Sequence, residues 1–375
     1  MERKQTRAWA EIDLSALDHN FDVIRAHADR PIMCIVKANA YGHGAVPVAR
    51  RLEKRGAAYF GVATGDEALE LRAAGVRAPI LILGYVDEID MPAIVRHDIT
   101  VPIYDQETAE LFSRAAVSEG RPVKVHLTLD TGMSRLGFPA HRTEETIARL
   151  LALSKLPGLQ VDGAFTHFAV SDTESAADRA FTQQQLTLFR TVCDGLEAAG
   201  LPLPNKHCAN SGGVVQYTDS YMDMVRAGVI LYGYQPDPAN PMRIDVRPVM
   251  AVKTHIVQVR ELESDRMVGY GCTYRSTEPI REAVVAIGYA DGYLRAGSNR
   301  AAVVIDGRPA PVIGRVCMDM LMVRLPEGVR AHRGDVVTVF GDAPVTADTI
   351  AEAAGTISYE VLCAVSHRIP RIYLG

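Results

Sequence analysis

The sequence lacks any long, uninterrupted apolar segment. No apolar run approaches the roughly 20 residues that an α-helix needs to cross a bilayer. Residues 1–20, MERKQTRAWAEIDLSALDHN, are charged and contain no apolar stretch of the kind found in secretory leaders. We therefore expect a cytoplasmic protein with no membrane partner.

The sequence also contains few cysteines and has no excess of positive charge. The six cysteines form no C-x-x-C pair, so their spacing favours reduced thiols over a disulfide framework or a zinc site. Lys and Arg total 40 against 45 Asp and Glu, which gives a formal net charge of −5. A protein that binds nucleic acid normally has a basic face. We expect neither a metal ion nor a nucleic-acid partner.

The chain is long enough for two domains, and its pattern changes part-way along. Residues 235–245, QPDPANPMRID, contain three prolines, which interrupt any regular element. Alternating strand-like and helix-like segments precede them, and short β-branched strands follow. The sequence predicts an α/β domain over residues 1–240 and a β-rich domain over residues 241–375.

The first domain is predicted to be a (β/α)₈ barrel. Eight apolar or β-branched runs alternate with helical patterns, as a barrel of this kind requires. These runs span residues 31–37, 59–64, 79–84, 98–103, 123–130, 161–168, 206–211 and 223–233. An open, doubly wound sheet is the alternative, but such a sheet more often carries a glycine-rich dinucleotide fingerprint after its first strand.

The second domain is predicted to be mostly β. Strand patterns occupy residues 250–262, 282–289, 301–316 and 334–341, with a hairpin turn at Asp306-Gly307. A helix is expected over residues 347–354 and an extended tail over residues 365–375.

Lys37 is the first candidate for chemistry, because it ends the apolar run Met33–Val36. A lysine at the mouth of a barrel is poorly solvated, and desolvation lowers its pKa as a Schiff-base lysine requires. From position alone, a lysine that merely marks where a strand meets water is the more common case.

Possible phosphate-binding residues surround this lysine in the predicted barrel. The segment Asn39–Gly44 combines an amide, a phenol, an imidazole and two glycines, and glycines let backbone N–H groups approach an anion. One such segment, residues 209–213, lies at the end of the seventh predicted strand. Another, residues 226–229, lies within the eighth predicted strand, toward its end. Barrels often bind phosphate at the loops after these two strands.

Together, these motifs resemble the alanine racemase family. VKANAYGHG (36–44) is similar to the segment that carries that family's cofactor lysine. Further matches follow in the family's order and cover both domains: DTGMSRLGF (130–138), THF (166–168), ANS (209–211), RAGVILYG (226–233), GYGCTY (269–274), IGYADGY (287–293) and GRVCMDM (314–320). The resemblance implies an enzyme that uses pyridoxal 5′-phosphate to interconvert L- and D-alanine and supplies D-alanine for peptidoglycan.

The resemblance also assigns roles to residues of the first domain. Lys37 would hold the cofactor as a Schiff base, Arg135 would reach its phenolic oxygen, and Arg226 would face its pyridine nitrogen. His167 would support Arg226. The phosphate would be held by Tyr41, Ser211, Gly228 and Val229, with Asn210 beside them. Because a guanidinium keeps its proton, the pyridine nitrogen should stay unprotonated, which disfavours side reactions such as transamination.

Racemisation removes a proton from one face of Cα and returns one to the other, which two bases do most directly. Lys37 is one base, and the resemblance makes Tyr270 the second. Tyr270 belongs to the β-rich domain, which in this family reaches the partner's barrel in a head-to-tail homodimer. Met318 and Asp319 would bind the substrate carboxylate through backbone amides, and Tyr289 would narrow the entrance. From sequence alone, Met318 could equally be a core methionine.

Two residues depart from the family pattern. Thr128 stands where many members have a lysine that becomes carbamylated and steadies Arg135, so Arg135 would need another anion such as a halide. His367 replaces a tyrosine near the phosphate and could admit a larger side chain such as serine. A racemase with another or broader range of amino acids is therefore an alternative.

Three other functions fit parts of the pattern. A pyridoxal phosphate amino-acid decarboxylase of the same architecture would have a carboxylate facing the pyridine nitrogen, against which Arg226 argues. A non-catalytic cofactor carrier would end after the barrel. A Schiff-base aldolase without the cofactor leaves the matches at Ser211 and Gly228 unexplained.

Overall fold

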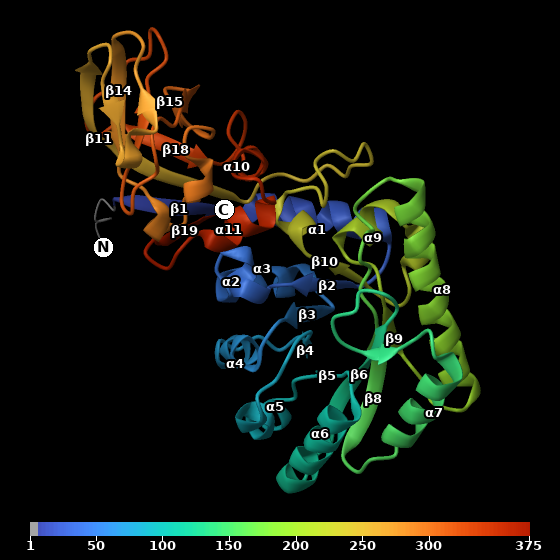
Figure 1. Cartoon of the computed structure of the whole chain (residues 1–375). Coiled ribbons are helices and arrows are strands. Elements are labelled where there is room, and N and C mark those ends of the chain that lie inside the picture. Colours follow the sequence, from blue (N-terminus) through green and yellow to red (C-terminus); the bar gives the residue numbers. More distant parts are fainter. Residues whose placement is uncertain (1–6) are drawn as a thin grey trace.

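The computed structural model describes residues 7–375, and in them eight parallel strands form the predicted barrel (Figure 1). Each predicted run overlaps one observed strand. The strands are β2 (Ile32–Ile35), β3 (Tyr59–Val62), β4 (Ile80–Ile82), β5 (Val101–Ile103), β6 (Val123–Asp130), β8 (Leu159–Phe165), β9 (Asn205–His207) and β10 (Val225–Ala227). One correction concerns Lys37, which does not end a strand. Strand β2 stops at Ile35, and Lys37 begins the short helical segment α2 (Lys37–Tyr41).

Hydrogen bonds close these strands into a ring. Two sheets have the orders β10-β2-β3-β4 and β5-β6-β8-β9. A parallel bridge between Leu81 and Thr100 joins β4 to β5. On the other side, the Arg226 N–H donates to the Ala209 carbonyl at 2.9 Å and joins β10 to the segment after β9. Parallel strands that close in this way bring all their carboxyl ends to one face of the barrel.

Helices surround the barrel (Figure 1). They are α1 (Leu14–Ala28), α3 (Ala45–Arg55), α4 (Gly65–Ala73), α5 (Met91–Arg96), α6 (Gln106–Glu119), α7 (Thr143–Leu153), α8 (Ala176–Ala198) and α9 (Ser211–Gln216). Each presents its buried residues to the strands. In α8, for example, Leu186, Phe189, Cys193 and Leu196 recur at three- and four-residue steps and are all buried. No helix within residues 7–375 is both long enough and apolar enough to span a bilayer.

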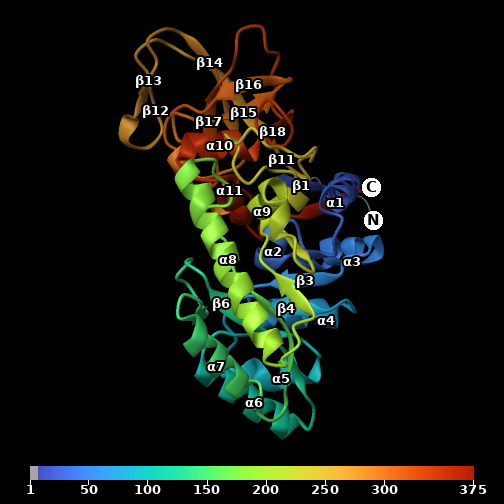
Figure 2. The same cartoon turned by 90° about the vertical axis from the view of Figure 1, so that its right-hand side faces the viewer.

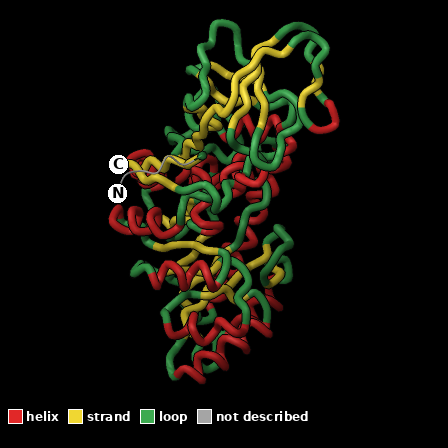
Figure 3. The backbone as a smooth tube through the Cα atoms, turned by 90° about the vertical axis from the view of Figure 1, so that its left-hand side faces the viewer, coloured by secondary structure: helices red, strands yellow, loops and turns green. Residues whose placement is uncertain are grey.

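The second lobe is rich in strands, as predicted (Figure 3). Its strands are β11 (Met250–Leu262), β12 (Met267–Val268), β13 (Tyr274–Arg275), β14 (Ile280–Val285), β15 (Ala302–Ile305), β16 (Arg308–Pro311), β17 (Leu321–Arg324), β18 (Val336–Phe340) and β19 (Arg371–Leu374). Two helices accompany them, α10 (Ala347–Ala354) and α11 (Ser358–Ala364). Asp306 and Gly307 have φ values of 51° and 71° and form the predicted tight turn between β15 and β16.

The first described strand, β1, belongs to the second lobe. Strand β1 (Ala8–Asp13) pairs antiparallel with β11 and parallel with β19 before α1 enters the barrel (Figure 1). One continuous apolar core then includes residues of both lobes, such as Phe60 in the barrel and Val303 in β15. The two lobes are therefore held together by strand pairing as well as by packing, and the position of one relative to the other is fixed by the core.

Candidate active site

A cavity of about 520 Å³ opens where the barrel strands end. This volume is in the range of sites that bind small molecules and cofactors. Eight of the residues singled out from the sequence line it: Lys37, Tyr41, Arg135, His167, Asn210, Ser211, Arg226 and Gly228. Val229 is fully buried next to Gly228 and begins the 3₁₀ turn Val229–Tyr232. It is not among the described residues that line the cavity.

Lys37 is followed by an unusual left-handed turn. The residues Ala38, Asn39, Ala40 and Tyr41 have φ values between +52° and +55°. This conformation costs residues other than glycine roughly 1–2 kcal/mol each. Such strain persists where the surroundings enforce it, and it concentrates at functional sites. Here the carboxylate of Glu67 accepts the Ala38 N–H at 2.6 Å and the Ala63 N–H at 2.7 Å.

The two glycines of this segment do not serve the role that we expected. A Cβ on Gly42 would lie 2.3 Å from the Leu362 carbonyl oxygen, and one on Gly44 would lie 1.9 Å from the Tyr373 hydroxyl. They let the left-handed turn pack against α11 and β19. Neither glycine is among the residues that the structure shows lining the cavity. The idea that they bring N–H groups to an anion is therefore wrong.

The electrostatic surroundings of Lys37 agree with the sequence-based argument. Burial, followed by the positive charge of Arg135, lowers the pKa of Lys37, while Glu67 opposes the shift. A lowered pKa increases the share of the neutral amine, which is the nucleophilic form.

Two hydroxyl groups converge on the backbone of Gly228. The Gly228 N–H donates to Ser211 Oγ at 3.0 Å. A Cβ on Gly228 would lie 2.9 Å from the Tyr41 hydroxyl and 3.3 Å from Ser211 Oγ. Asn210 caps α9, because its Oδ1 accepts the Gly213 N–H at 2.9 Å. Asn210 thus fixes the turn that presents Ser211, and the cradle consists of two hydroxyls around a residue without a side chain.

Arg226 is 3% exposed and forms no ion pair with any carboxylate in residues 7–375. Its Nη1 donates to the carbonyl oxygen and to Nδ1 of His207, both at 2.9 Å. Its Nη2 reaches the Thr166 and Cys208 carbonyls and lies 3.2 Å from His167 Nδ1. Only Nε has no partner among the described residues. Burial lowers the pKa of Arg226 to about 10, so the guanidinium stays charged at neutral pH.

A chain of imidazoles connects Arg226 to a carboxylate inside the barrel. An arginine can only donate, so His207 Nδ1 accepts, and His207 Nε2 then donates to His126 Nδ1 at 2.9 Å. His126 Nε2 faces Asp162 Oδ2 at 3.4 Å. Burial alone would raise the pKa of Asp162, but hydrogen bonds from His126 and Tyr59 lower it. Asp162 is therefore the anion that balances Arg226 through two neutral imidazoles.

Three buried histidines and the partly buried His167 make the fold sensitive to acid. Burial lowers the pKa values of His43, His126, His167 and His207, that of His43 from 6.5 to about 4. The unfolded chain therefore takes up protons before the folded chain does. This stability is fully present above about pH 6.5 and is lost as the pH falls toward 4, by about 3 kcal/mol for His43 alone. The midpoint of urea denaturation should drop markedly from about pH 7.5 to about pH 5.

A pair of variants isolates the share of His43. His43 Nδ1 donates toward the Ala40 and Tyr41 carbonyls at 3.0 Å, and an asparagine amide can replace this donor without titrating. His43→Asn should weaken the pH dependence, whereas the same change at the exposed His332 should leave it intact. Equal pH dependence in His43→Asn and the original chain would contradict this account.

Arg135 is exposed and makes no hydrogen bond or ion pair with any residue that the structure describes. Next to it lies a small cavity of about 20 Å³, also lined by Thr128. The Thr128 hydroxyl is buried and has no hydrogen-bond partner among residues 7–375. This space suffices for one water molecule or a small ion. An anion that steadies Arg135 here stays a prediction.

The residues predicted from the second lobe lie away from the cavity of their own chain. Tyr270, Tyr289 and Met318 are 68%, 42% and 52% exposed, and none of them is among the described residues that line it. Tyr270 lies between β12 and β13, which project from the end of the second lobe far from the barrel (Figure 2). Because Met318 is 52% exposed, the alternative that it is a core methionine is excluded. Asp319 accepts from Arg368 at 2.7 Å.

His367 is exposed and does not line the cavity either. The second lobe instead contributes Tyr359 and Cys363 of α11 to the cavity wall. Sequence reasoning missed both, as it missed His126, Asp162 and His207. One feature of the sequence could have pointed to the imidazole chain: His126 interrupts the otherwise largely apolar strand VKVHLTLD.

Comparison with known proteins agrees with the architecture and the cavity. Residues 12–236 match the model of the alanine racemase N-terminal domain, and residues 249–373 match that of the C-terminal domain. A curated alanine racemase from Desulfovibrio desulfuricans is 44% identical over 98% of both chains. One from Clostridium perfringens is 41% identical over 97% of this chain and 95% of its own.

Solved structures give the same result. The alanine racemase of Clostridium difficile 630 superposes with a TM-score of 0.94 at 38% identity, covering 99% of this chain and 97% of its own. That of Streptomyces lavendulae, which produces D-cycloserine, gives 0.93 at 34% identity, over 100% and 98%. With both domains matched and the cavity residues in place, the chain belongs to the alanine racemase family.

Proposed function

We propose that this chain is a pyridoxal phosphate-dependent racemase that interconverts L- and D-alanine and supplies D-alanine for peptidoglycan. One observation carries the proposal. A single cavity gathers Lys37, whose pKa is lowered, the hydroxyls of Tyr41 and Ser211, and the buried guanidinium of Arg226. The enzyme's location in the cytoplasm and the lack of nucleic-acid or membrane partners stay predictions.

The residues of the cavity fit pyridoxal phosphate. Lys37 Nζ would hold it covalently, while the Tyr41 and Ser211 hydroxyls and the backbone at Gly228 and Val229 would hold its phosphate. The absence of a Cβ at Gly228 keeps this cradle open. Arg226 would meet the pyridine nitrogen through Nε, its one N–H group without a partner among the described residues, and His167 supports it from behind. Arg135 would reach the phenolic oxygen, and Asn210 would hold Ser211 in place.

When bound, the cofactor supplies a conjugated system that stabilises negative charge at Cα. Arg226 would keep the ring nitrogen unprotonated, because the guanidinium retains its own proton at neutral pH. This limits the spread of charge into the ring and favours the immediate return of a proton to Cα. Lys37 Nζ would exchange the proton on one face and the Tyr270 hydroxyl on the other.

The second base is supplied by a partner in this proposal. Tyr270, Tyr289, Met318 and Asp319 are exposed or half-exposed and lie apart from the cavity of their own chain. A head-to-tail homodimer would bring them to the partner's barrel. The barrel of residues 1–240 would then hold the cofactor, and residues 241–375 would complete the site of the other subunit.

A decarboxylase remains the second candidate from sequence, but the cavity favours racemisation. The chain supplies no carboxylate within hydrogen-bonding distance of Arg226 in the described residues, and a protonated pyridine ring would need one there. The same cationic cavity, with Lys37, Arg135 and Arg226, disfavours substrates that carry a positive side chain.

A racemisation panel tests the proposal. Alanine, serine, lysine and arginine, each supplied as the pure L- and the pure D-form, are followed by chiral chromatography. We expect alanine to react in both directions and serine to follow within about 10²-fold, because an added hydroxyl is hard to exclude sterically. Lysine and arginine should react more slowly still. Failure of the cofactor-loaded enzyme to racemise alanine from either form would refute the proposal.

A further inference from the structure

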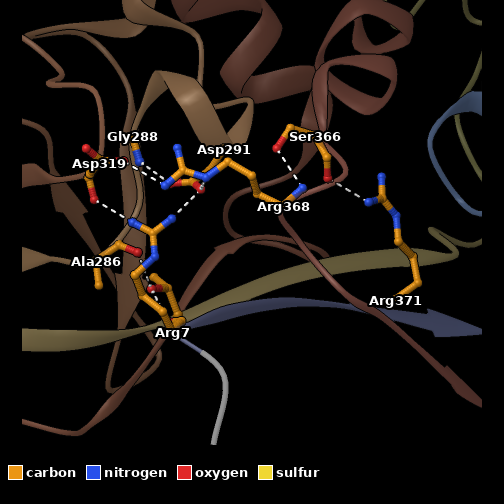
Figure 4. Close-up of polar contacts among 9 residues, drawn as sticks. Arg7, Ala286, Gly288, Asp291, Asp319, Ser366, Arg368 and Arg371 are labelled. Carbon is orange, nitrogen blue, oxygen red and sulfur yellow. Dashed lines mark hydrogen bonds and ion pairs between the residues drawn. The ribbon is translucent and has the colours of Figure 1, made fainter.

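Asp291 is a fully buried carboxylate at the centre of a charged cluster in the second lobe (Figure 4). It ends the 3₁₀ turn Tyr289–Asp291. Arg7 pairs with its Oδ1, and Arg368 Nε lies 3.5 Å from the same atom. Its Oδ2 accepts the Gly288 N–H at 3.0 Å. Burial of a carboxylate is costly unless it is paired and hydrogen-bonded, and here both conditions are met.

The same two arginines continue to Asp319. Arg368 Nη2 donates to Asp319 Oδ1 at 2.7 Å, and Arg7 Nη1 donates to the Asp319 carbonyl oxygen at 3.0 Å. Two guanidinium groups thus neutralise two carboxylates. Without Arg368, the Asp319 carboxylate would repel any anion that approached the neighbouring backbone.

The turn that Asp291 closes also holds the loop before β17. The Tyr289 N–H donates to the Cys317 carbonyl and the Ala290 N–H to the Met318 carbonyl, both at 3.0 Å. In a trans peptide the N–H points opposite to the C=O. The N–H groups of Met318 and Asp319 therefore point away from the turn, and they have no partner among residues 7–375.

The contact between turn and loop tolerates no side chain. A Cβ on Gly288 would lie 2.3 Å from the Cys317 carbonyl oxygen and 2.4 Å from that of Met318. The loop carbonyls therefore rest directly against the backbone of the turn.

The arginines are anchored outside the loop. Arg7 precedes β1, and the Thr254 hydroxyl lies 2.9 Å from its carbonyl oxygen. Arg368 belongs to the segment before β19, and Arg371, the first residue of β19, donates to the Ser366 carbonyl in that segment at 2.7 Å (Figure 4). Arg371 Nε also binds the Gly42 carbonyl at 2.9 Å, next to the left-handed turn of Lys37. The cluster thus joins the loop to the strands at the base of the second lobe.

We propose that Asp291 is a positioning residue for the substrate carboxylate. It fixes the Tyr289–Asp291 turn, which holds the carbonyls of Cys317 and Met318 so that the amides of Met318 and Asp319 face outward as a pair of donors. This inference rests on the proposed function, which brings these amides to the partner's cavity. The roles of Arg7 and Arg368 are to tie the turn to the loop and to cancel the charge of Asp319.

The test compares Asp291→Asn with Glu282→Gln in cofactor-loaded enzyme. Glu282 is an equally buried carboxylate in β14, paired with Arg260 Nε at 2.5 Å, and within residues 7–375 no hydrogen bond or ion pair links its side chain to residues 316–320. Asp291→Asn should raise KM for alanine by on the order of tenfold, because a neutral amide binds the two arginines and the Gly288 N–H more weakly than a carboxylate does. The groups that exchange the proton are unchanged, so the effect should fall on substrate binding. Its kcat and the absorbance of its bound cofactor should change little. Glu282→Gln should alter none of these values.

Hydrogen–deuterium exchange supplies a readout that does not depend on activity. In Asp291→Asn, peptides covering residues 288–292 and 316–320 should exchange faster, and the barrel peptides should not. Arg368→Ala, which changes a half-exposed side chain and should not impair folding, should reproduce both effects. An unchanged KM, or faster exchange spread equally over the protein in both carboxylate variants, would overturn the proposal. If the original chain fails to racemise alanine, the proposed function is refuted, and exchange at residues 316–320 still decides whether Asp291 holds the loop before β17.

Discussion

Replacing Lys37 with alanine is expected to abolish racemisation of alanine, lowering kcat by about 10⁴-fold or more. The change removes both the amine that would hold the cofactor and the base on one face of Cα. Lys37 precedes the left-handed turn and does not itself have a positive φ, so alanine adds no backbone strain there and the fold should survive. Chiral chromatography measures the rate, and the visible absorbance of the purified protein reports lysine-bound cofactor.

An exposed lysine provides the control. Lys54 lies in the last turn of α3 and does not line the cavity. Lys54→Ala should keep both the rate and the absorbance of the original chain. A Lys37→Ala variant that retained activity within tenfold of the original would show that another group does its work, and the account of the cavity would fail.

Mixing two inactive variants should restore activity. Tyr270→Phe should lose racemisation in at least one direction while it keeps the cofactor, because only the proton-exchanging hydroxyl is removed. A hybrid dimer of one Tyr270→Phe chain and one Lys37→Ala chain has one site with both defects and one intact site. Random pairing of the two chains should therefore give about a quarter of the original activity, as expected for two equivalent sites in a symmetric dimer.

Different affinity tags on the two chains make this experiment decisive. Hybrid dimers purified through both tags should have about half the original activity, since one site in two is intact. Activity no higher than that of the two parent variants, in dimers shown to be hybrid, would mean that Lys37 and Tyr270 do not meet across an interface. The exposure of Tyr270, Tyr289 and Met318 would then need another explanation.

Local patterns in the sequence were enough to locate most of the fold. The eight barrel strands follow from their apolar runs, and the β15–β16 hairpin follows from Asp306-Gly307, since both signals depend on neighbouring residues. Strand β1 was missed because its partners, β11 and β19, lie more than 200 residues away in the sequence. No local pattern reveals such pairing.

The site was predictable mainly through motifs that resemble a known family. Lys37 drew attention because it ends an apolar run, but its role and that of Arg226 came from the resemblance of VKANAYGHG and RAGVILYG to the alanine racemase family. The left-handed turn at Ala38–Tyr41 was not predictable, because alanine there ordinarily favours a right-handed helix and the surrounding contacts, such as that with Glu67, override the preference. The imidazole chain behind Arg226 requires the register of three strands, and Asp291 requires contacts between segments far apart in the chain.

The central claim is that Lys37 carries the cofactor. The purified enzyme is treated with borohydride, which reduces a Schiff base to a stable amine, and is then digested and mapped by mass spectrometry. We expect a phosphopyridoxyl group on the peptide that contains Lys37 and on no other lysine. Cofactor released quantitatively by denaturation after reduction, or found on a different lysine, would contradict the account.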